Sequence, residues 1–223
     1  HPMHAGTGEL VASAIIKAAQ KTGMPNGVFS NLNSSGIEVG QALVKHPSIK
    51  GVGFTGSIRA GRALFDLAAK RPEPIPVFAE MGSVNPVIFL PEGLNEKAVD
   101  WAKIYAGSIT LGAGQFCTNP GLLLGIAGEG LKQFGLTLAE EIIKIAPTCM
   151  LHPTICDAYE SNKAKVVSQE GVSVLADYED TSQNNYGRQI VSKVSGAVFL
   201  ENPTLHLEVF GPSSLLVICK DAA

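Results

Sequence analysis

A cysteine in a glycine-rich turn is the residue of this chain best suited to nucleophilic chemistry. Cys117 follows Gly112-Ala113-Gly114 and lies between a predicted helix and a predicted strand. Such a turn exposes the thiol and directs backbone N–H groups at nearby negative charge, which favours a thiolate able to attack a carbonyl carbon. The alternative interpretation is a buried structural cysteine, the commoner fate of a single cysteine.

A carboxylate at the end of an apolar strand is a candidate general base. Glu80 follows Phe78-Ala79 and precedes the glycine turn at Gly82. Side chains at the carboxyl ends of parallel strands face the crevice in which ligands bind, so Glu80 could serve chemistry there. The alternative is that Glu80 simply points into water, as most glutamates do.

A third segment suits a phosphate group. A strand ending at Phe54 runs into Gly56, and Ser57 then opens a helix. The N–H groups and dipole at a helix start attract anions, and the Ser57 hydroxyl would add a donor. The segment lacks the Gly-x-Gly-x-x-Gly fingerprint, so Ser57 could equally be an ordinary helix cap. A fourth segment, Leu207–Pro212, reads by itself as a strand ending in a turn.

Alternating helices and strands must position these residues. In the first part of the chain, helical spacing covers residues 10–19, 39–45 and 57–68, and strands are predicted at 28–30, 52–54 and 75–79. From Ser83 onward, strands are predicted at 87–90, 122–124, 172–174, 197–200 and 215–218, helices at 95–111, 131–145 and 154–169, and a polar loop at 177–186. This alternation predicts an α/β fold with a parallel sheet covered by helices.

Composition sets broad limits on the class of protein. The chain has 223 residues, 45% of them hydrophobic, and a net charge of -3, which suits a packed core and offers no strong attraction to nucleic acid or anionic membranes. No apolar run approaches the ~18 residues that span a bilayer. The four cysteines lack zinc-ligand spacing, so we expect free thiols in a reducing cytoplasm. Because the chain starts at His1 without an initiator Met, we expect a segment of a longer protein.

The four segments occur in the order found in aldehyde dehydrogenases. Phe-Thr-Gly-Ser-x-x-x-Gly, Glu-Met-Gly, Gly-Gln-Phe-Cys-Thr and Glu-x-Phe-Gly-Pro together resemble that superfamily over nearly the whole chain. Three segments are similar in sequence to 2-oxoglutarate semialdehyde (2,5-dioxovalerate) dehydrogenases, namely Arg71–Pro76, Gly82–Pro86 and Gly114–Gly121. The NADP-dependent long-chain aldehyde dehydrogenases are near relatives of that group.

The resemblance implies a domain division and a reaction. Residues 1–82 would form part of the dinucleotide-binding domain and residues 83–223 part of the catalytic domain. Cys117 matches the family nucleophile and Glu80 the general base. The implied reaction oxidises an aldehyde to a carboxylate through a thiohemiacetal and a thioester on the cysteine, and no metal is implied.

The resemblance also implies a cofactor, NAD or NADP, and residues that hold it. Ser57 matches the residue at the pyrophosphate, and Gly56 and Gly61 let the cofactor approach closely. Glu208 matches the carboxylate that binds the nicotinamide ribose hydroxyls. Phe210 matches the aromatic residue that packs near the nicotinamide.

Several positions depart from the usual pattern of the superfamily. Ser83 and Val84 stand where Gly and Lys are common, and both changes also occur in the semialdehyde branch. The Lys that binds the adenosine ribose and the Asn of the oxyanion hole would lie before His1. Relatives that use NADP place an Arg near the position of Ile37 to bind the 2'-phosphate. Ile37 offers no charge, which argues against a preference for NADP, although the cofactor stays open between NAD and NADP.

Three functions therefore remain open. The first is oxidation of 2-oxoglutarate semialdehyde, which needs a cationic or donor-rich pocket, and the second is oxidation of long-chain fatty aldehydes, which needs a wide apolar tunnel. The third is a folded segment that is inactive by itself, which we expect of the isolated 223 residues because the Asn and Lys are missing. For the complete enzyme we expect a homo-oligomer.

Overall fold

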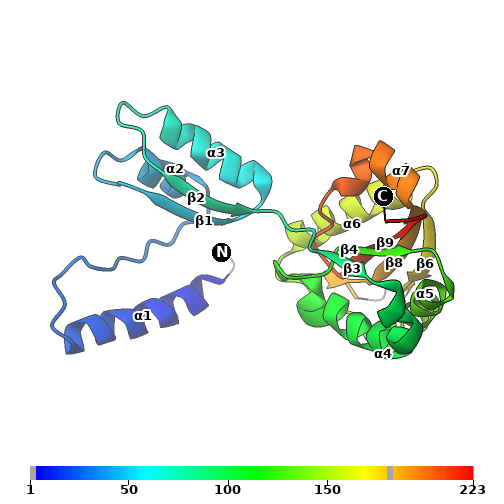
Figure 1. The fold of residues 1–223 in the computed structure, drawn as a ribbon. Coiled ribbons are helices and arrows are strands. Elements are labelled where there is room, and N and C mark those ends of the chain that lie inside the picture. The colour runs from blue at the N-terminus through cyan, green and yellow to red at the C-terminus, as the bar shows by residue number, and fades with distance from the viewer. Residues whose placement is uncertain (1–3, 180–182, 223) are drawn as a thin grey trace. The chain divides into compact units, whose positions relative to one another are not determined.

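The computed structural model describes residues 4–179 and 183–222. The chain divides into two compact units, His1–Met81 and Gly82–Ala223. Both units combine helices with parallel strands (Figure 1), so the predicted α/β fold class is confirmed.

The first unit is built on a two-stranded parallel sheet. Strands β1 (Val52–Gly56) and β2 (Val77–Met81) pair in parallel, as predicted for residues 52–54 and 77–79. Helix α3 (Ile58–Ala69) connects them, and helices α1 (Ala5–Lys21) and α2 (Glu38–Lys45) precede them. Parallel strands require such a crossover connection, so this is a β–α–β unit.

One short strand predicted in this unit is wrong. Residues 28–30 form a bend and irregular backbone, and no strand of the described residues pairs with them. A strand is stabilised by hydrogen bonds to a neighbouring strand, and β1 and β2 pair here with each other. The apolar side chains of Val28 and Phe29 alone were therefore an insufficient signal.

The second unit is built on a five-stranded sheet in the order β3-β4-β9-β8-β6. Its four parallel strands are β3 (Pro86–Phe89), β4 (Leu122–Ile126), β9 (Ser213–Cys219) and β8 (Ile190–Ser195), and β6 (Ser173–Asp177) joins β8 antiparallel. A separate antiparallel pair consists of β5 (Thr148–Cys149) and β7 (Tyr186–Gly187). Of the polar loop predicted at 177–186, residues 180–182 lie outside the described residues.

Helices cover both faces of the sheet (Figure 1). Helices α4 (Pro91–Thr110) and α5 (Glu129–Ile142) pack on one face, and α6 (Pro153–Val167) and α7 (Gly196–Glu201) on the other. Within β4, Leu123 joins the core beneath α4 and α5, whereas Leu122 and Leu124 face the opposite core. This alternation follows from the two-residue period of a strand and explains why the strand is apolar throughout.

The predicted strand at 197–200 is wrong, because these residues form α7. Ser195 accepts a hydrogen bond from the Val198 N–H at 3.3 Å and so caps the helix. The strand lies just upstream, in β8, which the sequence analysis missed. A good N-cap thus outweighed the strand preference of Val198 and Phe199.

Candidate active site

Sheet topology explains why distant motifs meet in the second unit. Ser83 to Asn85 precede β3, the cysteine turn precedes β4, and Glu208 to Pro212 precede β9. These three strands are parallel and adjacent. The segments that lead into them must therefore lie at the same edge of the sheet.

The turn before the cysteine is left-handed. Gly112, Ala113 and Gly114 have φ of 57°, 57° and 65°. Glycine adopts this region freely, whereas for alanine it costs about 1–2 kcal/mol. The buried methyl group of Ala113 packs with Met150 and Tyr159, which offsets part of that cost. The turn is held by tertiary packing rather than by local preference.

Cys117 lies at the second position of a β-turn and is exposed. The Asn119 N–H donates to the Phe116 carbonyl at 3.0 Å, which closes the turn over Cys117 and Thr118. The N–H groups of the two central residues take no part in that bond. An exposed thiol beside two such N–H groups suits attack on a carbonyl carbon and stabilisation of the resulting oxyanion.

The segment Ser83–Asn85, which precedes β3, forms hydrogen bonds with the carbonyl oxygens of this turn. The Asn85 amide donates to the Cys117 carbonyl at 2.7 Å and to the Asn119 carbonyl at 2.9 Å. The Ser83 hydroxyl donates to the same Cys117 carbonyl and accepts from Asn85 at 2.6 Å. Further along, the N–H of Gly121 and that of Leu122 donate to the Val84 carbonyl at 3.0 and 3.1 Å. Both ends of the loop that carries Cys117, residues 116–121 (the cysteine loop), are therefore hydrogen-bonded to the segment Ser83–Asn85.

The segment before β9 closes the network from the other side. The Asn119 amide donates to the Gly211 carbonyl at 3.0 Å. Gly114 lies directly against Gly211, because a Cβ placed on Gly114 would be 2.2 Å from the Gly211 carbonyl carbon. The buried ring of Tyr159 packs against Gly211, and its hydroxyl donates to the Arg188 carbonyl. The cysteine loop is thus packed between the two other motifs.

Glu208 is bonded to the same network. Its Oε1 accepts from the Ser83 N–H at 2.9 Å, and the side chain is half-buried. Burial raises the pKa of this carboxyl above its usual range, and the Ser83 N–H partly opposes that rise. One segment therefore contacts both the Cys117 backbone and the carboxylate implied to bind ribose.

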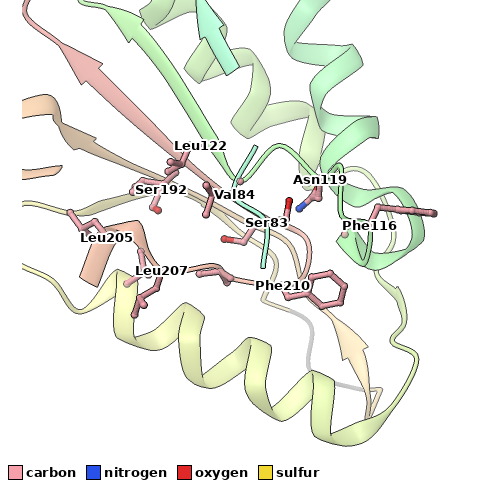
Figure 2. Close-up of a pocket in the computed structure, with 15 residues that line it drawn as sticks. Ser83, Val84, Phe116, Asn119, Leu122, Ser192, Leu205, Leu207 and Phe210 are labelled. Atoms are coloured by element: carbon pink, nitrogen blue, oxygen red, sulfur yellow. The ribbon is translucent and has the colours of Figure 1, made fainter. Parts of the chain in front are cut away.

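A small cavity joins these segments (Figure 2). Ser83, Asn119 and Phe210 line one end, and Leu205 and Leu207 lie toward the other, within a volume of about 30 Å³. That volume holds one or two water molecules and nothing larger. Asn119 Oδ1 is buried and has no hydrogen-bond partner among the described residues.

The other predicted site residues belong to the first unit. Glu80 is exposed on β2, opposite Thr55 in the sheet register. Ser57 caps α3, since its hydroxyl accepts from the Ala60 N–H at 3.3 Å. Gly61 is buried, and a Cβ there would be 2.2 Å from the sulfur of Met81, so any larger residue would require the Met81 side chain to move. The approach of Glu80 to Cys117 stays a prediction.

Each unit, taken by itself, offers groups that suit part of a dinucleotide. In the first unit, the exposed N-terminus of α3 at Gly56 and Ser57 offers N–H groups suited to a pyrophosphate. In the second unit, Glu208 and Phe210 offer a carboxylate for ribose hydroxyls and an aromatic face. In the described part of the chain, no group of three or more His, Cys, Asp or Glu residues could hold a metal ion.

The sequence analysis missed the residues that build the network. Asn85, Asn119, Gln115 and Tyr159 were assigned no role. Gln115 accepts from the Leu151 N–H at 2.9 Å and donates to the Gly112 carbonyl at 3.0 Å, so it braces the turn. The one local signal was an asparagine directly before a proline, in Asn85-Pro86 at the start of β3 and in Asn119-Pro120 two residues before β4.

Replacing Gly114 by Ala is expected to cost the second unit about 2–5 kcal/mol. The left-handed backbone contributes about 1–2 kcal/mol, and overpacking against the Gly211 backbone about 1–3 kcal/mol. Urea denaturation followed by Trp101 fluorescence measures this, because the single tryptophan packs against the core of that unit.

Gly112→Ala is the matched control for Gly114→Ala. Its φ of 57° is similar, but the added Cβ would meet only the exposed ring of Phe116, which can rotate away. We expect a loss of about 1–2 kcal/mol from the backbone alone. Equal losses for the two variants would show that contact with Gly211 does not hold the turn.

Glu208→Gln is expected to raise the melting temperature near neutral pH. Because the folded-state pKa of Glu208 is raised, the folded state binds the proton more tightly, and stability falls as pH rises through and above the usual value of 4.5. Glutamine removes the desolvated charge and can still accept from the Ser83 N–H. Thermal melts should therefore separate the two proteins near neutral pH and converge near pH 4. A lower melting temperature at neutral pH would show that ionised Glu208 stabilises the fold.

Comparison with known proteins identifies the class. The sequence profile described as "Aldehyde dehydrogenase family" matches residues 4–223. The chain therefore belongs to the aldehyde dehydrogenase family. None of the helices in the described residues has the length and hydropathy that crossing a bilayer requires.

Particular relatives share more of the sequence. The chain is 44% identical over 221 residues to alpha-ketoglutaric semialdehyde dehydrogenase 2 of Azospirillum brasilense, covering 99% of this chain and 42% of the relative. It is 39% identical over 224 residues to alpha-ketoglutaric semialdehyde dehydrogenase of Acinetobacter baylyi, covering 100% of this chain and 42% of the relative. The chain thus spans about two fifths of the length of these relatives.

Solved structures share the fold. One is gamma-glutamyl-gamma-aminobutyraldehyde dehydrogenase from Burkholderia cenocepacia, with a TM-score of 0.77, 21% identity, and coverage of 95% of this chain and 43% of that one. Another is an NAD-dependent benzaldehyde dehydrogenase from Corynebacterium glutamicum, with a TM-score of 0.72, 23% identity, and coverage of 91% and 44%. Identities this low support the fold and carry no statement about substrate.

Proposed function

We propose that this chain carries the nucleophile, the general base and part of the cofactor site of an NAD(P)-dependent aldehyde dehydrogenase. The observation that carries the proposal is the exposed Cys117, held in a turn that hydrogen bonds connect to Glu208. Residues 1–82 would belong to the dinucleotide-binding domain and residues 83–223 to the catalytic domain.

The proposed chemistry proceeds through a covalent bond to Cys117. The thiolate attacks the aldehyde carbon, and the turn N–H groups stabilise the oxyanion of the thiohemiacetal, each donor being worth about 2.7–4 kcal/mol in comparable sites. A bound nicotinamide dinucleotide supplies the acceptor for the hydride that leaves this carbon. The carbon is thereby oxidised to a thioester on Cys117. Glu80 then takes one proton from water as the water attacks the thioester carbon, and the carbon–sulfur bond breaks to restore the thiolate. The carboxylic acid product loses its remaining proton to solvent and leaves as the carboxylate.

We propose 2-oxoglutarate semialdehyde as the substrate. The relatives that are 44% and 39% identical carry that name, which supports the proposal. The same proposal includes a cofactor that is either NAD or NADP, a homo-oligomeric assembly and a cytoplasmic location. Long-chain fatty aldehydes are the alternative substrates.

An assay of the complete gene product tests the proposed function. With NAD and NADP supplied in turn, we expect 2-oxoglutarate semialdehyde to be oxidised with a higher kcat/KM than a long-chain aldehyde of equal concentration. Reduced nicotinamide absorbance and product mass measure this. A preference for the long-chain aldehyde would show that long-chain aldehydes are the substrates. If no aldehyde causes reduction of NAD or NADP, the proposed function is wrong.

A further inference from the structure

Asn85 has a geometry that no motif assigned to it. Its Nδ2 atom lies within 2.6 to 2.9 Å of three oxygens, Ser83 Oγ and the carbonyls of Cys117 and Asn119. The two carbonyl oxygens can only accept hydrogen bonds, so the amide group facing them must be the NH₂. The two amide protons of Asn85 thus face three acceptor oxygens. A third proton comes from the Ser83 hydroxyl, which donates to the Cys117 carbonyl.

Few residue types can occupy this position. Asn85 has φ of 40°, in the left-handed region, where Asn, Asp and Gly are the residues found most easily. Of these three, only Asn has an uncharged amide that donates two hydrogen bonds at all pH values. Both the backbone and the surrounding acceptors therefore select asparagine.

The consequence for the nucleophile follows from peptide geometry. Holding the Cys117 carbonyl fixes the plane of the peptide that joins Cys117 to Thr118. In a trans peptide the N–H points opposite to the C=O, so the Thr118 N–H is directed away from Asn85. Fixing that plane restricts rotation about the Cα–C bond of Cys117 and so restrains the backbone that carries the thiol. The same amide holds the Asn119 carbonyl, on the far side of the turn.

We propose that Asn85 is a positioning residue for the nucleophile, setting the orientation of the Cys117 thiol and the adjoining N–H group. This inference rests on the proposed function. Asn85 acts through Cys117 and need not contact substrate. Its loss should lower kcat by about 10²-fold, the scale on which a displacement of about 1 Å affects catalysis. Cofactor affinity should change less than about threefold, because Asn85 donates to the cysteine turn and to Ser83 Oγ rather than to Glu208.

Two variants of the complete gene product test the inference. Asn85→Gly keeps the left-handed backbone and removes the donors, so kcat should fall at every pH while the Kd for the dinucleotide stays within about threefold. Asn85→Asp has the same shape but, once ionised, faces the same oxygens with acceptors alone. Lowering the pH toward about 5 protonates a growing fraction of that carboxyl and restores a donor, so the ratio of its kcat to that of the wild type should rise. Parallel pH profiles for Asn85→Asp and the wild type would overturn the inference.

Asn185 provides the matched control. It also has a positive φ, 63°, and its amide donates to the Met150 carbonyl at 2.9 Å and approaches the Cys149 sulfur at 3.4 Å. Asn185→Gly should lower the melting temperature about as much as Asn85→Gly while leaving kcat unchanged. If kcat falls in both variants in proportion to the loss of melting temperature, the positioning role of Asn85 is overturned. If the wild type is active and Asn85→Gly is fully active, only this inference is overturned. If the wild type is inactive, both the proposed function and the inference are overturned.

Discussion

Replacing Cys117 by Ala is expected to abolish aldehyde oxidation, lowering turnover at least about 10⁴-fold, as removal of a nucleophile does in other covalent enzymes. The alanine side chain cannot form the thiohemiacetal, so no thioester follows. Dinucleotide affinity should remain within about threefold, because Glu208 keeps its hydrogen bond to Ser83 and the turn keeps its backbone bonds. Steady-state assays and isothermal titration of the dinucleotide into the complete gene product measure the two effects.

Cys149→Ala is the control for the cysteine assignment. Cys149 is also exposed, but it lies in β5 and outside the left-handed turn. Its removal should leave turnover unchanged. An inactive Cys149→Ala with an active Cys117→Ala would move the nucleophile to Cys149.

Replacing Glu80 by Gln is expected to slow the release of the acyl group while leaving its formation intact. Glutamine keeps the size of the side chain and its hydrogen bonding but cannot take a proton from water. The loss of a general base lowers a rate about 10²–10⁴-fold. Rapid mixing should therefore show a burst of reduced nicotinamide near one per active site, followed by a much slower steady rate.

The burst also distinguishes two roles for Glu80. It persists if Cys117 ionises without help from Glu80, and it disappears if Glu80 deprotonates the thiol. Full steady-state turnover would remove Glu80 from the mechanism. Glu73→Gln is the control, since Glu73 is an exposed carboxylate of the same unit that pairs with Lys50 at 2.9 Å, and its loss should leave the kinetics unchanged.

Local patterns predicted much of the fold. The parallel pairing of β1 with β2 and the sandwich of helices around the second sheet follow from alternating apolar segments, glycine turns and helix lengths. The errors occurred where a partner or a cap decided the outcome. Residues 28–30 lack a neighbouring strand among the described residues, and Ser195 caps a helix where Val198 and Phe199 favoured a strand.

The exposure of Cys117 was predictable from the sequence, whereas the construction of its turn was not. An exposed thiol in a glycine-rich turn was predicted for Cys117, and the structure places it so. The left-handed conformation of Ala113 and the bonds made by Asn85 depend on residues that approach through the order of the sheet strands. No local pattern encodes that order, because β4 and β9 are neighbours in the sheet although β5 to β8 lie between them in the chain.

Mapping the covalent intermediate tests the role of Cys117 most directly. The Glu80→Gln enzyme is mixed with aldehyde and dinucleotide, quenched in acid after the burst, digested and analysed by mass spectrometry. The acyl group, with the mass of the substrate less one hydrogen, is expected on the peptide that contains Cys117, in an amount equal to the burst. A burst accompanied by acyl label on Cys149, Cys156 or Cys219, with none on Cys117, would contradict the assignment of the nucleophile.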